Sequence, residues 1–89
     1  MEAPDLNLLR ALDILLSEGS VVKAARKLKL SPSAMSRTLA RLRAVTGDQL
    51  LVRAGRGLVP TARALEMQGG VRAVVEEAQI LLRPRDMLK

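Results

Sequence analysis

The sequence contains no cysteine, no histidine and no aromatic residue. The first absence excludes disulfides and thiol nucleophiles, and the second excludes Ser-His triads and histidine-based metal sites. Without Phe, Tyr or Trp, the core has to be built from Leu, Val, Ile, Met and Ala, which favours helices over aromatic-rich sheets. We therefore expect a mainly helical protein that is not an enzyme and that uses no metal or cofactor.

Long apolar runs and targeting signals are also lacking. No stretch of the 89 residues is long and apolar enough to suggest a membrane span, and the N-terminus has no basic segment ahead of an apolar core, as a signal peptide would. We expect a cytoplasmic protein with no membrane partner. A chain of this length predicts one small domain with one core and room for one protruding element.

Acidic residues are almost absent from the middle of the chain. Ten of the 15 lysines and arginines lie between Lys23 and Arg63, where the single acidic residue is Asp48. This segment has a formal charge of about +9, whereas the whole chain has +6, so the remaining positions are net negative. The pattern indicates a segment that meets a polyanion, although a charge run taken alone is more often a solvated surface.

Capping residues and glycines predict two helices in the first third of the chain. Apolar periodicity predicts a helix over about residues 6–17, with Asp5 as its N-cap and Gly19 as its end. Ser20 is the expected cap of a second, short and basic helix over the segment "VVKAARKLK".

A third helix is predicted from Ser31, a capping hydroxyl followed by Pro32, to about Thr46, with Gly47 as its stop. The buried arc of its helical wheel comprises Met35, Thr38, Leu39, Leu42 and Val45. The opposite arc comprises Ser33, Ser36, Arg37, Ala40 and Arg41. This helix has arginines but no acidic residue, whereas helices that serve only stability usually carry i,i+4 partners of opposite charge. We therefore favour contact with DNA bases or phosphates over a purely structural amphipathic helix.

After Gly47 the pattern changes to two short apolar runs around a glycine-rich segment. Residues 50–52 and 58–59 are predicted to form two strands, joined by a tip that carries Arg53 and Arg56. Two strands alone are marginally stable, so the hairpin should pack on the helical core. The candidates for this packing are Leu51, Val52 and Leu58. Beside a basic helix-turn-helix, the hairpin is typical of a wing that contacts phosphates or a minor groove, but a structural hairpin could carry the same arginines for solubility.

A long helix is predicted from Ala62 to Leu82, with Thr61 as its N-cap. Its apolar residues are spaced alternately by three and four, as in a heptad seam. The seam comprises Ala64, Met67, Val71, Val74, Ala78 and Leu81. It could pack on its own domain, but further apolar positions widen the surface, so we favour a homodimer through this helix. Residues 83–89 have no apolar period and are expected to form a disordered tail.

The order of a first helix, "EGSVVKAARKLKLSPSAMSRTLARLR", "GDQLLVRAGRGLVPT" and a long helix resembles the N-terminal DNA-binding domain of LysR-type transcriptional regulators. The resemblance covers about residues 5–82. It implies a mainly α fold: a winged helix-turn-helix of three helices and a two-stranded β wing over residues 1–60, then a linker and dimerisation helix over residues 61–82. The helix that starts at Ser31 would be the recognition helix. The candidate DNA-binding residues are Ser31, Pro32, Ser33, Ser36, Arg37, Ala40, Arg41, Arg53 and Arg56.

The sequence departs from the family pattern in three respects. The family usually has Ser-Gln-Pro-Ala at the start of the recognition helix, where this chain has Ser31-Pro32-Ser33-Ala34, so a glutamine that often reads bases is missing. Gln49-Leu50-Leu51 stands where Pro-Leu-Phe is usual, which predicts a smaller local core. These regulators also normally continue into an effector domain, so the chain is expected to be an excised domain or a natural short form.

The combined expectation is a bacterial regulator that binds an imperfectly palindromic site in duplex DNA as a homodimer whose linker helices pack antiparallel. Two alternatives remain open. The chain could be an interaction module or short form that pairs with a full-length regulator or an acidic protein, or it could be a nucleoid-type or RNA-binding protein without sequence preference.

Overall fold

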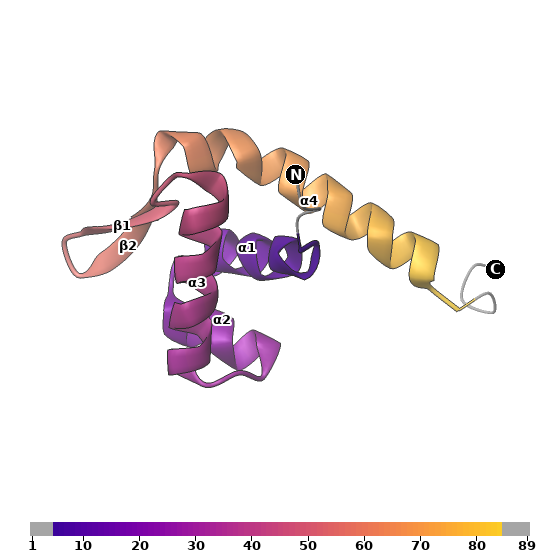
Figure 1. Cartoon of the computed structure of the whole chain (residues 1–89), viewed down its shortest axis with the longest axis horizontal. Coiled ribbons are helices and arrows are strands. Elements are labelled where there is room, and N and C mark those ends of the chain that lie inside the picture. The colour runs from indigo at the N-terminus through magenta and orange to yellow at the C-terminus, as the bar shows by residue number, and fades with distance from the viewer. Residues whose placement is uncertain (1–4, 85–89) are drawn as a thin grey trace.

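The computed structural model describes residues 5–84, which form four helices and one two-stranded sheet. The elements are α1 (Asn7–Glu18), α2 (Val21–Leu28), α3 (Pro32–Thr46), β1 (Leu51–Ala54), β2 (Gly57–Pro60) and α4 (Ala62–Leu82). The first three helices pack together, the hairpin projects from the end of α3, and α4 runs past α1 in the opposite direction (Figure 1). The expected mainly α, winged helix-turn-helix fold is confirmed.

Side-chain caps fix the starts of three helices. The hydroxyl of Ser20 accepts a hydrogen bond of 3.2 Å from the backbone N–H of Lys23. Ser31 and Thr61 accept equivalent bonds of 3.1 Å at the starts of α3 and α4. These three caps were predicted from the sequence. They set the chain directions on either side of the helix-turn-helix turn and the wing, because each cap satisfies an N–H that the helix itself cannot.

The start of α1 differs from its prediction. The N-cap is Leu6, which makes no side-chain cap, and α1 begins at Asn7. Asp5 lies one residue earlier than a cap would, but its Oδ1 still accepts a hydrogen bond of 3.0 Å from the backbone N–H of Asn7. At the other end, Gly19 adopts the expected left-handed conformation with φ 63°.

The core is aliphatic and draws on all elements except β2. Its buried residues are Leu8, Ala11, Leu12, Leu15, Leu16, Ala24, Ala25, Met35, Leu39, Leu42, Leu50, Leu51, Ala64 and Val71. Val45 was expected in the buried arc of α3 but is 61% exposed, because it lies about 80° around the helix from Met35, at the edge of the face that Met35, Leu39 and Leu42 bury. The buried part of α3 is therefore narrower than predicted.

The hairpin is antiparallel, and Leu51 lies opposite Pro60 while Ala54 lies opposite Gly57. The strands thus extend further than predicted, and the tip consists of Gly55 and Arg56 alone. Leu51 is fully buried and Leu58 packs against the core, whereas Val52 is exposed. Two of the three predicted anchors therefore hold the wing on the helices.

Helix α4 has two halves with different surroundings. In its first half, Ala64 and Val71 are buried in the core, and Met67 packs beside them. Its last turns project beyond α1, where Leu81 and Leu82 are 79% and 84% exposed (Figure 1). The first half of α4 therefore contributes to the same core as α1. The predicted tail lies outside the described residues apart from Arg83 and Pro84. None of the helices within residues 5–84 is long and apolar enough to cross a membrane.

Candidate nucleic-acid interface

The outer surface of α3 is built from small and basic side chains. Ser33, Ser36, Arg37, Ala40 and Arg41 are all exposed, as the helical wheel predicted. Ser31 is occupied as the helix cap, and its hydroxyl oxygen lies 3.3 Å from that of Ser33. Pro32 occupies the first helical position and is also exposed. A surface with small side chains at its centre and hydrogen-bond donors around them can approach DNA closely.

Arg37 lies in the middle of this surface and carries an uncompensated charge. Within residues 5–84, no acidic group forms an ion pair with its guanidinium. Ala40 lies one turn further along the same face, and Ala44 follows it, so this side of the arginine is lined by small side chains. Arg37 can therefore present its planar set of donors to a base edge or a phosphate.

The other two arginines of α3 lie on its flanks and have different partners. Arg41 is rotated by about 40° from Arg37 around the helix, and its Nη2 lies 3.3 Å from Oδ2 of Asp5. Arg43 is rotated by about 120° the other way, and it donates hydrogen bonds of 2.9 Å to the backbone oxygens of Gln49 and Leu51. Although α3 contains no acidic residue, two of its arginines have partners elsewhere in the chain. Arg41 pairs with a distant acid, and Arg43 is a structural residue.

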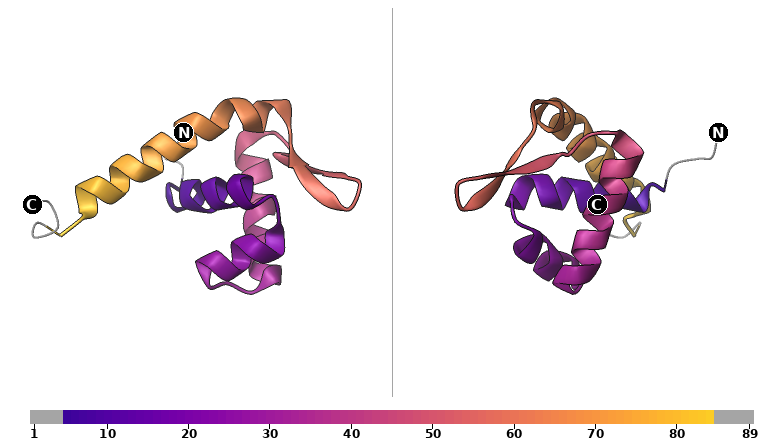
Figure 2. Two further views of the ribbon diagram at one scale, coloured as in Figure 1. Left: turned by 180° about the vertical axis from the view of Figure 1, so that it is seen from behind. Right: turned by 60° about the vertical axis from the view of Figure 1, so that its left-hand side comes forward.

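The wing carries two exposed arginines at different places. Arg53 lies within β1 opposite Leu58, not at the tip as predicted. Arg56 is at the tip, next to Gly55, whose φ of 61° is one that residues with a side chain rarely adopt. The hairpin projects on the opposite side of the molecule from the C-terminal end of α4 (Figures 1 and 2).

A hydrogen-bonded brace around Asp48 joins α3, the wing and α4. Oδ2 of Asp48 accepts bonds of 2.7 Å from the hydroxyl of Thr61 and 2.8 Å from the backbone N–H of Leu50. These two bonds, with a smaller contribution from the nearby Arg63, lower the pKa of Asp48 below its ordinary value of 3.8, against a small desolvation effect. Asp48, the one acid of the basic segment, is therefore a structural residue.

The brace also supports an unusual backbone conformation. Leu50 has a φ of 66°, in the left-handed region that favours glycine. Its side chain is fully buried, its N–H is bound by Asp48, and its carbonyl oxygen accepts a bond of 2.9 Å from the N–H of Thr61. Burial of a leucine and two hydrogen bonds thus hold the conformation that a glycine would adopt freely.

The predicted seam of α4 is not one continuous surface. Ala64 and Val71 are buried by the chain itself, so they are not available to a second copy, and the heptad seam is corrected at these positions. Val74, Ala78 and Leu81 are exposed. The physical reason is that α1 packs closely on the first half of α4, whereas the start of α1 leaves an open groove beside the second half, and the last turns of α4 project beyond it.

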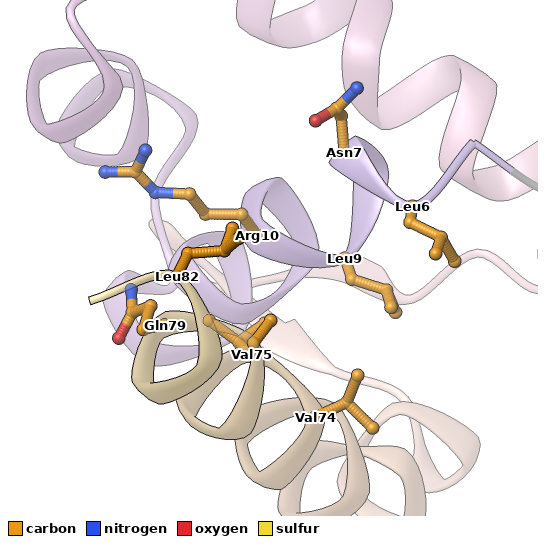
Figure 3. Close-up of a pocket in the computed structure, with 9 residues that line it drawn as sticks. Leu6, Asn7, Leu9, Arg10, Val74, Val75, Gln79 and Leu82 are labelled. Atoms are coloured by element: carbon orange, nitrogen blue, oxygen red, sulfur yellow. The ribbon is translucent and has the colours of Figure 1, made fainter. Parts of the chain in front are cut away.

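An apolar groove of about 530 Å³ runs between the start of α1 and the second half of α4. Figure 3 shows Leu6 and Leu9 on one side of it and Val74 and Val75 on the other, with Leu82 at one end. Leu6 and Val74 are 68% and 53% exposed. The groove could not be predicted from the sequence, because the period of each helix does not show how the start of α1 lies against α4.

The chain matches the model of the bacterial regulatory helix-turn-helix proteins of the lysR family over residues 6–65. The chain belongs to the LysR family. This match confirms the resemblance inferred from the sequence. It also confirms the expectation of a bacterial, DNA-binding regulator of transcription. Among residues 5–84, no acidic cluster is arranged to hold a metal ion.

Curated LysR-family relatives are similar over almost the whole chain. Nodulation protein D 1 of Bradyrhizobium sp. (strain NC92) is 46% identical over 82 residues, which are 92% of this chain and 26% of that protein. The HTH-type transcriptional regulator LeuO of Escherichia coli (strain K12) is 43% identical over 84% of this chain and 24% of its own length. The chain therefore spans about a quarter of the length of these relatives.

Solved structures of LysR-family proteins superpose well. A probable transcriptional regulator from Pseudomonas aeruginosa has a TM-score of 0.81 and 38% identity, and the match covers 91% of this chain and 28% of that one. The DNA-binding domain of BenM in complex with benA site 1 DNA has a TM-score of 0.79 and 25% identity, with 89% of both chains covered. The regulators similar to this chain thus include one whose matching domain was solved on DNA.

Proposed function

We propose that this LysR-family chain binds specific sites in duplex DNA as a homodimer and thereby regulates transcription. The observation that carries the proposal is the exposed, uncompensated Arg37 in the small-residue surface of α3. In a helix-turn-helix, the second helix enters the major groove and its first turns contact base edges. Ser33, Ser36 and Arg37 occupy those turns, and the BenM domain is a similar protein in complex with DNA.

The wing is assigned to backbone or minor-groove contact. Arg53 and Arg56 are exposed on the hairpin, and no acidic group within residues 5–84 pairs with either of them. Charged contacts of this kind supply affinity for any sequence, whereas base contacts supply specificity. Regulation of transcription follows from specific binding at a promoter and is supported by the family.

The homodimer is assigned to the second half of α4 and the apolar groove beside it. The exposed apolar residues of this surface are Leu6, Val74, Leu81 and Leu82. A twofold axis through such a surface would bring the same residues together from both chains. The protruding Leu81 and Leu82 of one copy then have an apolar groove on the other copy in which to lie.

The experiment that tests the function is selection of bound sequences from a random duplex pool, followed by measurement of affinity for the selected site. A dimer should select an imperfect palindrome whose half-sites lie about one helical turn, roughly 34 Å, or a multiple of it apart. Insertion of about 5 base pairs, half a turn, between the half-sites should then weaken binding strongly, because the two α3 helices can no longer reach one face of the DNA.

The same selection separates the alternatives. A specific regulator should bind its selected site at least about 10³-fold more tightly than random duplex. A nucleoid-type protein would enrich no motif, and an interaction module would retain no duplex at all. Either of the last two results contradicts the proposed function.

A further inference from the structure

Asp5 brings a negative charge to the edge of the candidate DNA-binding surface. Its Oδ2 lies 3.3 Å from Nη2 of Arg41, although the two residues are 36 positions apart in the sequence. Among residues 5–84, no other acidic side chain pairs with an arginine of α3. The pair therefore neutralises one of the few cations on this helix that a phosphate could reach.

The fold holds this carboxylate in place. Oδ1 of Asp5 accepts a hydrogen bond of 3.0 Å from the backbone N–H of Asn7, and its backbone oxygen accepts one of 3.1 Å from the N–H of Leu8. The carboxylate thus lies at the N-terminus of α1, where unpaired N–H groups favour a negative charge. Asp5 cannot leave without disturbing the start of α1, whereas the long side chain of Arg41 can turn away.

The surroundings of the pair are basic. Asp5 and Arg41 line a shallow pocket of about 300 Å³ where α1, the end of α2 and α3 meet, and Arg10 lines it too. No acidic group within the described residues forms an ion pair with Arg10. Without Asp5, this edge would present two uncompensated arginines to DNA.

We propose that Asp5 is an intramolecular counter-ion for Arg41 that competes with a DNA phosphate and so limits the affinity of this surface. The inference rests on the proposed DNA binding. It adds one residue, Asp5, that lowers the affinity for DNA. The side chains of Arg41 and Asp5 are 62% and 39% exposed, and a pair so open to solvent is weak enough for a phosphate to displace. Because phosphates carry no sequence information, the effect is the same for every duplex.

The test compares Asp5→Asn with Asp13→Asn. Asn at position 5 keeps the oxygen that accepts the N–H of Asn7 but removes the charge. Asp13 is the matched control, because it also pairs with an arginine at 3.3 Å, Arg72, but it faces α4 instead of α3. Thermal unfolding of each variant verifies that it is folded.

Relative to Asp13→Asn, we expect Asp5→Asn to tighten binding to selected and random duplexes alike, by about two- to fivefold. The slope of log affinity against log salt should become steeper by up to about 0.9, as for one more neutralised phosphate. In an Arg41→Gln background, Asp5→Asn should no longer differ from Asp13→Asn. A purely structural role of Asp5 would not change the salt slope.

Equal affinities of the two variants, weaker binding of Asp5→Asn, or an undiminished effect in the Arg41→Gln background would each overturn the counter-ion. If the wild type and Asp13→Asn bind no duplex under any salt condition, the proposed function fails and the counter-ion with it. If the wild type binds duplex in a salt-dependent way but Asp5→Asn has the same affinity as Asp13→Asn, only the proposed role of Asp5 is rejected.

Discussion

Thr61 donates a hydrogen bond of 2.7 Å from its hydroxyl to the carboxylate of Asp48, while the oxygen of the same hydroxyl accepts one of 3.1 Å from the N–H of Ala64. A single side chain thus caps α4 and ties it to the turn that follows α3. The orientation of α4 relative to the candidate DNA-binding helix depends on this residue pair.

The pair makes stability depend on acid pH. Because the pKa of Asp48 is lowered in the folded chain, the stabilisation is complete above the ordinary value of 3.8 and is lost as pH falls through the lower folded pKa. We expect Asp48→Asn to lower the Tm at neutral pH, and the difference from the wild type to disappear as the pH falls through the lowered pKa of Asp48. Calorimetry of both proteins across this range is the measurement. A Tm difference that persists unchanged in acid would contradict the assignment.

Arg37 and Arg43 of α3 have different surroundings, and comparing them tests whether α3 reads bases. Arg37→Ala should leave the Tm unchanged, because the side chain is exposed and lacks an acidic partner within residues 5–84. It should cost roughly 1 to 3 kcal/mol on the selected site and flatten the base preference within the half-site. Repeating the duplex selection with the variant is the check. An unaltered motif from a folded Arg37→Ala protein would remove α3 from base readout.

Arg43→Ala is the contrasting variant. It leaves the carbonyl oxygens of Gln49 and Leu51 without their donor, so it should lower the Tm by loosening the connection between α3 and the wing. Any loss of DNA affinity should be similar for all sequences. A change of motif with an unchanged Tm would show that Arg43 reads bases instead.

Arg56 tests the wing. Arg56→Ala should weaken binding about equally on selected and random duplexes and reduce the salt slope by about 1, because it removes one phosphate contact without touching α3. Arg83→Ala is the control, since it makes the same charge change at the far end of α4. Titrations of both variants at several salt concentrations give the comparison. Identical slopes for the two variants would leave the wing without a role in binding.

Two valines of α4 separate dimerisation from folding. Val74 is 53% exposed, so Val74→Asp should change the free energy of unfolding by no more than about 0.5 kcal/mol while it splits the dimer. Val71 is only 6% exposed, and Val71→Asp should destabilise the single chain by about 3 to 5 kcal/mol. Sedimentation and chemical unfolding measure the two effects. A Val74→Asp protein that remains dimeric, or a wild type that stays monomeric at high concentration, would exclude this surface.

The helix boundaries could be predicted closely because the signals are local. Ser20, Ser31 and Thr61 each cap a helix through an N–H three residues away, and Gly19 and Gly47 end helices through their own backbone conformation. Such signals lie within one turn of the chain and need no knowledge of the fold. The exposed arc of α3 follows from its helical period in the same way.

The partners of charged side chains could not be predicted, because they come from distant segments. Arg41 meets Asp5 across 36 residues, and Arg43 binds carbonyl oxygens in a connection whose path is not readable from composition. The seam of α4 was overextended for a related reason. Its period identifies one apolar stripe, but only the position of α1 determines that Val71 is covered and Val74 is not.

The left-handed Leu50 has a mechanical consequence. Its buried side chain and its backbone bonds to Asp48 and Thr61 anchor the segment between α3 and β1. On the proposed mode of binding, the reach from the α3 surface to Arg56 is then a fixed span, and a duplex whose grooves are spaced differently has to bend or twist to be held at both points. The stiffness of base pairs that no side chain touches would thereby become part of what the protein measures.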